Sequence, residues 1–120
     1  MEESLSTILI VDDSRDAADS LAAVLRLMGH TAHPVYSAKE ALGQVQALQP
    51  DVFLLDLALP DLDGYELARR LRTVAKKSAR FVAVSGYGPE IGGNLAASVF
   101  EIHIQKPVTP DALLKVVALT

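Results

Sequence analysis

Five polar residues lie at or just beyond the ends of short apolar runs, where buried strands would stop. They are Asp12, Asp13, Asp56, Ser85 and Lys106. If these runs are parallel strands, their carboxyl ends meet at one edge of a sheet, where ligands bind in such folds. That edge would then collect three carboxylates, one hydroxyl and one ammonium group.

Three clustered carboxylates repel one another, and burial raises their pKa values further. A hard divalent cation resolves this repulsion, because Mg²⁺ takes oxygen ligands and often combines one or two carboxylates with a phosphate. One carboxylate could then act as a nucleophile toward phosphorus and form an aspartyl phosphate. Ser85 could donate to one phosphoryl oxygen and Lys106 could neutralise another. The five residues thus fit a single reaction.

The elements that must position these groups alternate along the chain. Short apolar or β-branched runs predict strands at 8–11, 31–36, 52–55, 80–84 and 102–104. Apolar residues at helical spacing follow the strands, and Ser14, Ser37 and Thr109 are suited to cap three of the helices. Strands that alternate with helices predict an α/β fold with a parallel sheet covered on both faces. We expect one domain over residues 1–120.

Composition narrows the classes of function. The net charge of −4 excludes a general basic surface for nucleic acid or anionic lipid. The chain has no cysteine, which excludes disulfides and thiolate metal sites. No apolar stretch approaches a membrane span, and the N-terminus has no signal-peptide pattern. We therefore expect a soluble, cytoplasmic protein that binds neither nucleic acid directly nor a membrane.

The sequence predicts only structural roles for several other charged residues. Asp61 and Asp63 are predicted turn formers, with Gly64 supplying a permissive backbone. The basic side chains of the following helix are predicted to face solvent; they are Arg69, Arg70 and Arg72.

Four motifs, in order and with appropriate spacing, give the chain a clear resemblance. They are ILIVDD, VFLLDLALPDLDGYELARRLR, FVAVSGYG and HIQKPVTPDAL. Together they resemble the CheY-like receiver domain of bacterial two-component response regulators, over essentially the whole chain. The resemblance implies a doubly wound, flavodoxin-like fold with three layers, αβα, in which a sheet of five parallel strands in the order 2-1-3-4-5 lies between two layers of helices. The residues LPDLDGYELARRLR, SGYG and the later His and Lys-Pro-Val are most similar to receivers attached to hybrid sensor histidine kinases or related multidomain regulators.

The resemblance also implies a metal site and a phosphoacceptor. Asp56 matches the residue that accepts the phosphoryl group. Asp13 matches the direct ligand of Mg²⁺ (or Mn²⁺), and Asp12 the acidic neighbour that binds the ion through water. Ala58, two residues beyond Asp56, matches the position that gives a backbone carbonyl to the metal.

Further positions belong to the switch. Ser85 matches the hydroxyl residue that engages the phosphoryl group, and Lys106 matches the lysine of the family pattern. The Lys106–Pro107 peptide bond is usually cis in this family. The position three before Lys106 usually carries Tyr or Phe, which turns inward on activation, whereas here it is His103. Since histidine titrates near neutral pH, we expect this switch to be weakened or pH-sensitive.

The segment between Ser85 and Lys106 departs from the family pattern. It contains Pro89, Gly92 and Gly93, and each glycine lowers helix stability by about 1 kcal/mol relative to alanine. We therefore predict a short, mobile or displaced fourth helix.

The leading interpretation is a signalling phosphoacceptor and not an enzyme, apart from its own phosphorylation and dephosphorylation. Its expected partners are a sensor histidine kinase or a histidine phosphotransfer domain, together with an unknown downstream protein, and we expect a monomer or weak homodimer. A binding module that works without phosphorylation is the alternative. An aspartate-nucleophile phosphatase is disfavoured, because its second aspartate would stand at Ala58. Glycine-rich nucleotide-binding motifs and a histidine spacing suited to zinc are absent from the sequence.

Overall fold

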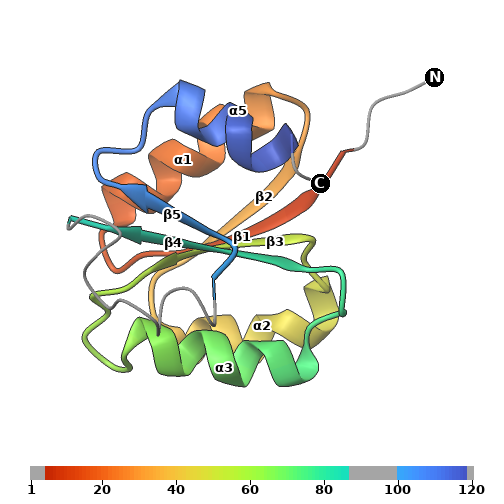
Figure 1. Ribbon diagram of the computed structural model, residues 1–120, viewed down its shortest axis with the longest axis vertical. Helices are drawn as coiled ribbons and strands as arrows, with labels where there is room; N and C mark the ends of the chain where they lie inside the picture. Colours follow the sequence, from red (N-terminus) through yellow and green to blue (C-terminus); the bar gives the residue numbers. More distant parts are fainter. Residues whose placement is uncertain (1–4, 87–99, 119–120) are drawn as a thin grey trace.

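The computed structural model, described for residues 5–86 and 100–118, contains one parallel sheet between two layers of helices (Figure 1). The strands are β1 (Thr7–Val11), β2 (Thr31–Val35), β3 (Val52–Asp56), β4 (Arg80–Ser85) and β5 (Ile102–Gln105). The helices are α1 (Arg15–Leu27), α2 (Ala38–Leu48), α3 (Gly64–Val74) and α5 (Pro110–Ala118). The strand order β2-β1-β3-β4-β5 confirms the implied fold. The predicted weak fourth helix falls within residues 87–99, outside the described residues.

Three of the described helices, α1, α2 and α5, begin where the sequence provides a capping side chain. The Ser14 hydroxyl accepts a hydrogen bond from the backbone N–H of Ala17 at the start of α1, and Ser37 does the same for α2. Thr109 Oγ1 accepts from Ala112 N at the start of α5. These bonds satisfy backbone donors that have no partner within the helix, so the three predicted caps are confirmed.

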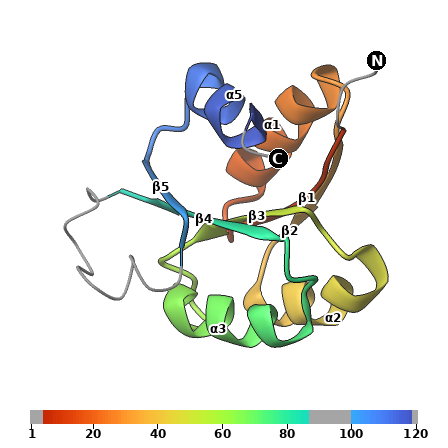
Figure 2. The ribbon, with the colours of Figure 1, turned by 45° about the vertical axis from the view of Figure 1, so that its right-hand side comes forward.

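The two faces of the sheet are covered by different helices (Figures 1 and 2). Alternate residues of β1 divide between the faces: Ile8 and Ile10 pack with α1 and α5, while Leu9 and Val11 pack with α2 and α3. All four of these side chains are buried. Burial on both faces explains why β1 and β3 are continuous apolar runs, which is typical of the inner strands of parallel sheets.

Parallel pairing brings the carboxyl ends of the strands to one edge. Asp56 stands opposite Val84, and Ser85 stands opposite Gln105. Strand β2, which contains Pro34, lies at the outer edge as its proline requires. Within the described ranges, no helix is long and apolar enough to cross a membrane.

Candidate functional site

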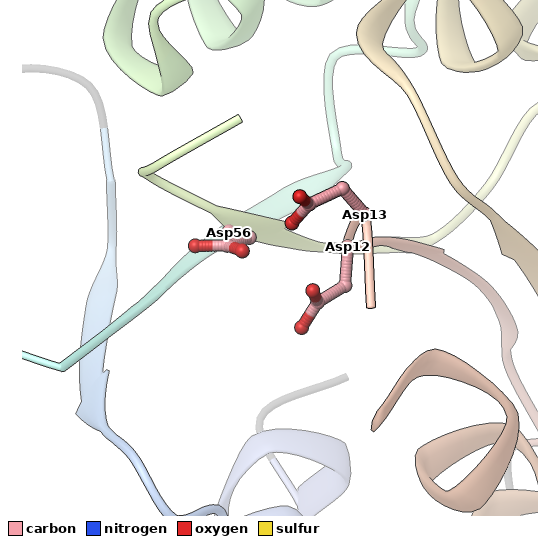
Figure 3. Close-up of side chains that lie close together, drawn as sticks. All are labelled: Asp12, Asp13 and Asp56. Carbon is pink, nitrogen blue, oxygen red and sulfur yellow. The ribbon is translucent and has the colours of Figure 1, made fainter. Parts of the chain in front are cut away.

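Three carboxylates meet at the carboxyl edge of the sheet. Asp12 and Asp13 follow the end of β1, and Asp56 is the last residue of β3. One oxygen atom from each lies within 4.8 Å of the other two, and Figure 3 shows the three side chains gathered there. Asp12 is only 3% exposed and Asp56 5%, whereas Asp13 is exposed. The cluster is therefore set into the core on one side and open to solvent on the other.

Lys106 supplies the positive charge of the site. Its Nζ atom lies 3.3 Å from Asp12 Oδ2 and 3.4 Å from Asp56 Oδ2. Burial alone would lower the pKa of Lys106, but attraction to Asp56 and Asp12 outweighs burial and raises it. Lys106 therefore stays an ammonium ion beside the two buried carboxylates.

Burial and charge repulsion both act on the carboxyl group of Asp12. Its burial raises the pKa of the carboxyl group, and repulsion from Asp56 raises it further, while a hydrogen bond from Ser14 N and attraction to Lys106 oppose the rise. The lysine thus compensates only part of the local negative charge. Three clustered carboxylate oxygens are the hard donors that Mg²⁺ prefers, and such an ion would relieve the remaining repulsion. The residues present therefore fit a divalent cation.

The turn after Asp56 is held by several contacts. Ala58 N donates to Asp56 Oδ1 at 3.0 Å, and Gly64 N donates to the Leu57 carbonyl at 3.3 Å. The Asp61 carboxylate accepts from the backbone N–H groups of Ala38 and Lys39 at the start of α2. Sequence reasoning gave Asp61 only a turn-forming role and missed this contact, because nothing in the pattern shows which helix the turn will approach.

The ends of β4 and β5 are joined through side chain and backbone. Ser85 Oγ lies 3.0 Å from His103 Nε2, and Lys106 N donates to the Ser85 carbonyl at 2.6 Å. The Lys106–Pro107 peptide bond is cis. The structure therefore brings Ser85 and Lys106 to the same edge as the acidic cluster, with His103 against Ser85.

A cleft of about 440 Å³ opens beside the cluster, between α1 and the segment that follows β5. Its lining is mostly apolar, with two charged residues of the site at its wall. The lining residues are Asp12, Ala17, Ser20, Leu21, Val84, Lys106, Pro107 and Val108. The cleft therefore borders the charged edge of the sheet.

Comparison with known proteins decides the family. Residues 8–118 match the family described as "Response regulator receiver domain". This chain is a receiver domain of that family. Such domains are signalling domains of two-component systems and bind Mg²⁺ through acidic residues, and the cluster of Asp12, Asp13 and Asp56 is of this kind.

Two relatives match most of the length of this chain. The chain is 34% identical over 112 residues to an "Uncharacterized 14.6 kDa protein in sodA1 3'region" of Leptolyngbya boryana, covering 92% of this chain and 86% of that protein. It is also 34% identical over 115 residues to "Sensor histidine kinase AtsR" of Burkholderia thailandensis, covering 92% of this chain but only 19% of that protein. The receiver domain thus spans about a fifth of the length of the kinase.

Solved structures agree with the fold. A CheY-like receiver domain from Methylobacillus flagellatus superposes with a TM-score of 0.89 at 32% identity, covering 97% of this chain and 98% of that one. A second, from Methanospirillum hungatei JF-1, gives a TM-score of 0.87 at 28% identity, covering 97% and 93%.

Proposed function

We propose that this receiver domain accepts a phosphoryl group on Asp56 from a phosphohistidine of a sensor histidine kinase or a histidine phosphotransfer domain. The observation that carries the proposal is the meeting of Asp12, Asp13 and Asp56 within 4.8 Å, beside the Lys106 ammonium. Similarity to part of a sensor histidine kinase supports a kinase as the phosphodonor.

Four residues would hold the metal. Asp13 would bind Mg²⁺ or Mn²⁺ directly and Asp12 through water, while Asp56 and the backbone carbonyl of Ala58 complete the protein's share of ligands. When bound, the ion offsets the negative charge of the carboxylates and of the incoming phosphoryl group. The exposed position of Asp13 leaves a path by which the ion can enter.

Asp56 is the nucleophile. One of its oxygens forms a bond to phosphorus while the P–N bond of the phosphohistidine breaks, and the electron pair of that bond returns to the donor imidazole. Such a transfer depends chiefly on positioning and charge neutralisation. Ala58 N contacts one Asp56 oxygen at 3.0 Å and Lys106 Nζ contacts the other at 3.4 Å. The chain itself therefore orients the attacking group from both sides.

The only reactions proposed for the chain are its own phosphorylation and dephosphorylation. Ala58 has no carboxyl group with which to protonate a leaving group, so the site does not fit an aspartate-nucleophile phosphatase. The phosphoryl group would form a hydrogen bond with the Ser85 hydroxyl and so shift a partner-binding surface between two states. The His103 ring would change position together with Ser85. The phosphorylated chain would act as a monomer or weak homodimer.

Intact mass spectrometry tests this function. The protein is incubated with acetyl phosphate, with and without Mg²⁺, beside Asp56→Asn and Asp16→Asn, the latter an exposed acid of α1. Wild type and Asp16→Asn should gain one phosphoryl mass only with Mg²⁺, and Asp56→Asn should gain none. An unmodified wild type would overturn the proposal in favour of a binding module that works without phosphorylation.

A further inference from the structure

The Ser85–His103 hydrogen bond joins the two inner residues of the switch. His103 stands opposite Ala83 in the register of the sheet. Ala83 comes two residues before Ser85, so the two lie on the same face of β4. Ala83 has only a methyl group, so the imidazole ring has space to lie along β4, and its Nε2 atom reaches Ser85 Oγ at 3.0 Å. Ser85 in turn lies one residue beyond Val84, the partner of Asp56 in the sheet. The bond therefore ends at the residue next to the phosphoacceptor.

The other ring nitrogen decides which atom donates in this bond. His103 Nδ1 is buried, and it has no hydrogen-bond partner among residues 5–86 and 100–118. A neutral imidazole has one N–H and one unprotonated nitrogen, whereas the cation has two N–H groups. A proton on Nδ1 would bury an N–H without an acceptor, which folded proteins rarely tolerate. The ring proton accordingly belongs on Nε2, facing Ser85.

We propose that His103 donates from Nε2 to Ser85 Oγ and so directs the Ser85 hydroxyl proton away from the ring, toward a phosphoryl oxygen on Asp56. Because Oγ accepts from the ring, its own proton cannot also point there. This inference rests on the proposed function of Asp56. His103 is a positioning residue that acts through Ser85, and a phenyl ring at its place would leave the hydroxyl direction unset.

The main chain at Ser85 is held in place by the sheet and by Lys106. The Ser85 carbonyl accepts from Lys106 N at 2.6 Å, and β4 pairs with β3 on one side and β5 on the other. The contact with His103 therefore acts on a side chain whose main chain is already held. The donor from His103 restricts rotation of the Ser85 hydroxyl before any phosphoryl group arrives.

Nitrogen NMR of the histidine rings tests the tautomer directly. The ¹⁵N-labelled protein is measured without phosphodonor at about pH 8, above the ordinary histidine pKa, and the His103 signals are assigned by their loss in His103→Gln. We expect the proton on Nε2. A proton on Nδ1 would overturn the inference. Since this measurement needs no phosphorylation, its outcome is independent of the proposed function.

A mutant cycle tests the consequence. His103→Phe removes the donor and should lower the fraction phosphorylated at fixed acetyl phosphate by about threefold to tenfold, whereas His103→Gln, whose amide can still donate, should retain more of it. His33→Phe, on the opposite edge strand, serves as the control. In a Ser85→Ala background, His103→Phe should have no further effect. A full effect of His103→Phe without the Ser85 hydroxyl would contradict a role exerted through Ser85.

Discussion

Lys106 Nζ lies 3.4 Å from Asp56 Oδ2, although fifty residues separate the two in the sequence. The contact exists because β3 and β5 both end at the same edge of the sheet, on either side of β4. It places a positive charge beside one carboxylate oxygen of Asp56. The same ammonium contacts Asp12, so Lys106 is the cation around which both buried carboxylates are arranged.

Loss of the Lys106 charge should destabilise the protein. In Lys106→Met, Asp12 and Asp56 would repel each other without compensation at neutral pH. Because Lys106 is itself 35% exposed, we expect a loss of about 1 kcal/mol in the free energy of unfolding, less than for a fully buried pair. Urea unfolding measures this, and saturating Mg²⁺ should recover most of the loss. Lys77→Met, an exposed lysine after α3, is the matched control; equal stability of the two variants would contradict this account.

The pH dependence of stability should report Asp12. Burial raises the folded-state pKa of Asp12 above 3.8, so between the unfolded and folded values the folded state binds more protons. Stability from this group is therefore present below the unfolded pKa and is lost as pH rises through the folded one.

The substitution Asp12→Asn removes the loss of stability that ionisation of Asp12 causes as pH rises. The amide oxygen of the new side chain can still accept the hydrogen bond from Ser14 N. Without metal, the free energy of unfolding of the variant relative to wild type should increase by on the order of 1 kcal/mol as pH rises from about 4 to 7. Urea titrations across this pH range give the difference. Mg²⁺ should stabilise wild type more than the variant; a difference that stays constant with pH would contradict the prediction.

Asp61 should contribute to the stability of the protein through its contact with the start of α2. Asp61→Ala removes the acceptor for Ala38 N and Lys39 N, which otherwise lack helical partners, and should cost about 1 kcal/mol of stability at pH 7. The hydrogen bond from Ala38 N lowers the pKa of Asp61. This contribution is therefore present above the unfolded pKa and is lost as pH falls through the lowered value.

Asp63→Ala is the control for this anchor, because Asp63 precedes α3 but makes no side-chain cap bond to it. Thermal unfolding of the two variants at pH 7 and at about pH 3 should separate them more at the higher pH than at the lower. Equal losses at pH 7 would show that the contact with α2 contributes nothing.

Gly64 should not tolerate a side chain. A Cβ atom there would lie 2.6 Å from Leu57 Cα and 3.1 Å from the Asp56 carbonyl oxygen, so the turn after Asp56 would have to shift. Gly64→Ala should therefore lose about 2 kcal/mol and phosphorylate more slowly. Gly43→Ala, inside α2 with nothing within 4 Å of the new atom, should instead gain about 0.5–1 kcal/mol. Chemical denaturation of both variants measures these changes, and the same sign for both would contradict the packing argument.

Local sequence patterns predicted most of the fold. Apolar runs such as Ile8–Val11 match buried strands because an inner parallel strand buries both faces, and Ser14 and Ser37 cap helices because their hydroxyls bond the adjacent turn. The polar residues at strand ends were expected to meet, since parallel strands bring their carboxyl ends to one edge. These inferences depend on contacts close in sequence or on sheet direction alone.

Contacts between elements were harder to predict. Arg72 is exposed, as predicted, but its guanidinium also stacks 4.2 Å from the Phe81 ring centre and pairs with Glu101 at 2.9 Å, and neither contact was predicted. Likewise, nothing in the pattern shows that Asp61 would contact α2. Such pairings depend on how helices pack on the sheet, which local hydrophobic patterns do not specify.

Mapping the modified residue tests the central claim most directly. After incubation with acetyl phosphate and Mg²⁺, borohydride reduces an aspartyl phosphate to homoserine, which peptide mass spectrometry can place in the sequence. We predict homoserine at Asp56, dependent on both the phosphodonor and Mg²⁺, and unchanged aspartate at Asp12 and Asp13. Homoserine at Asp12 or Asp13, or at no aspartate, would contradict the assignment of Asp56 as the phosphoacceptor.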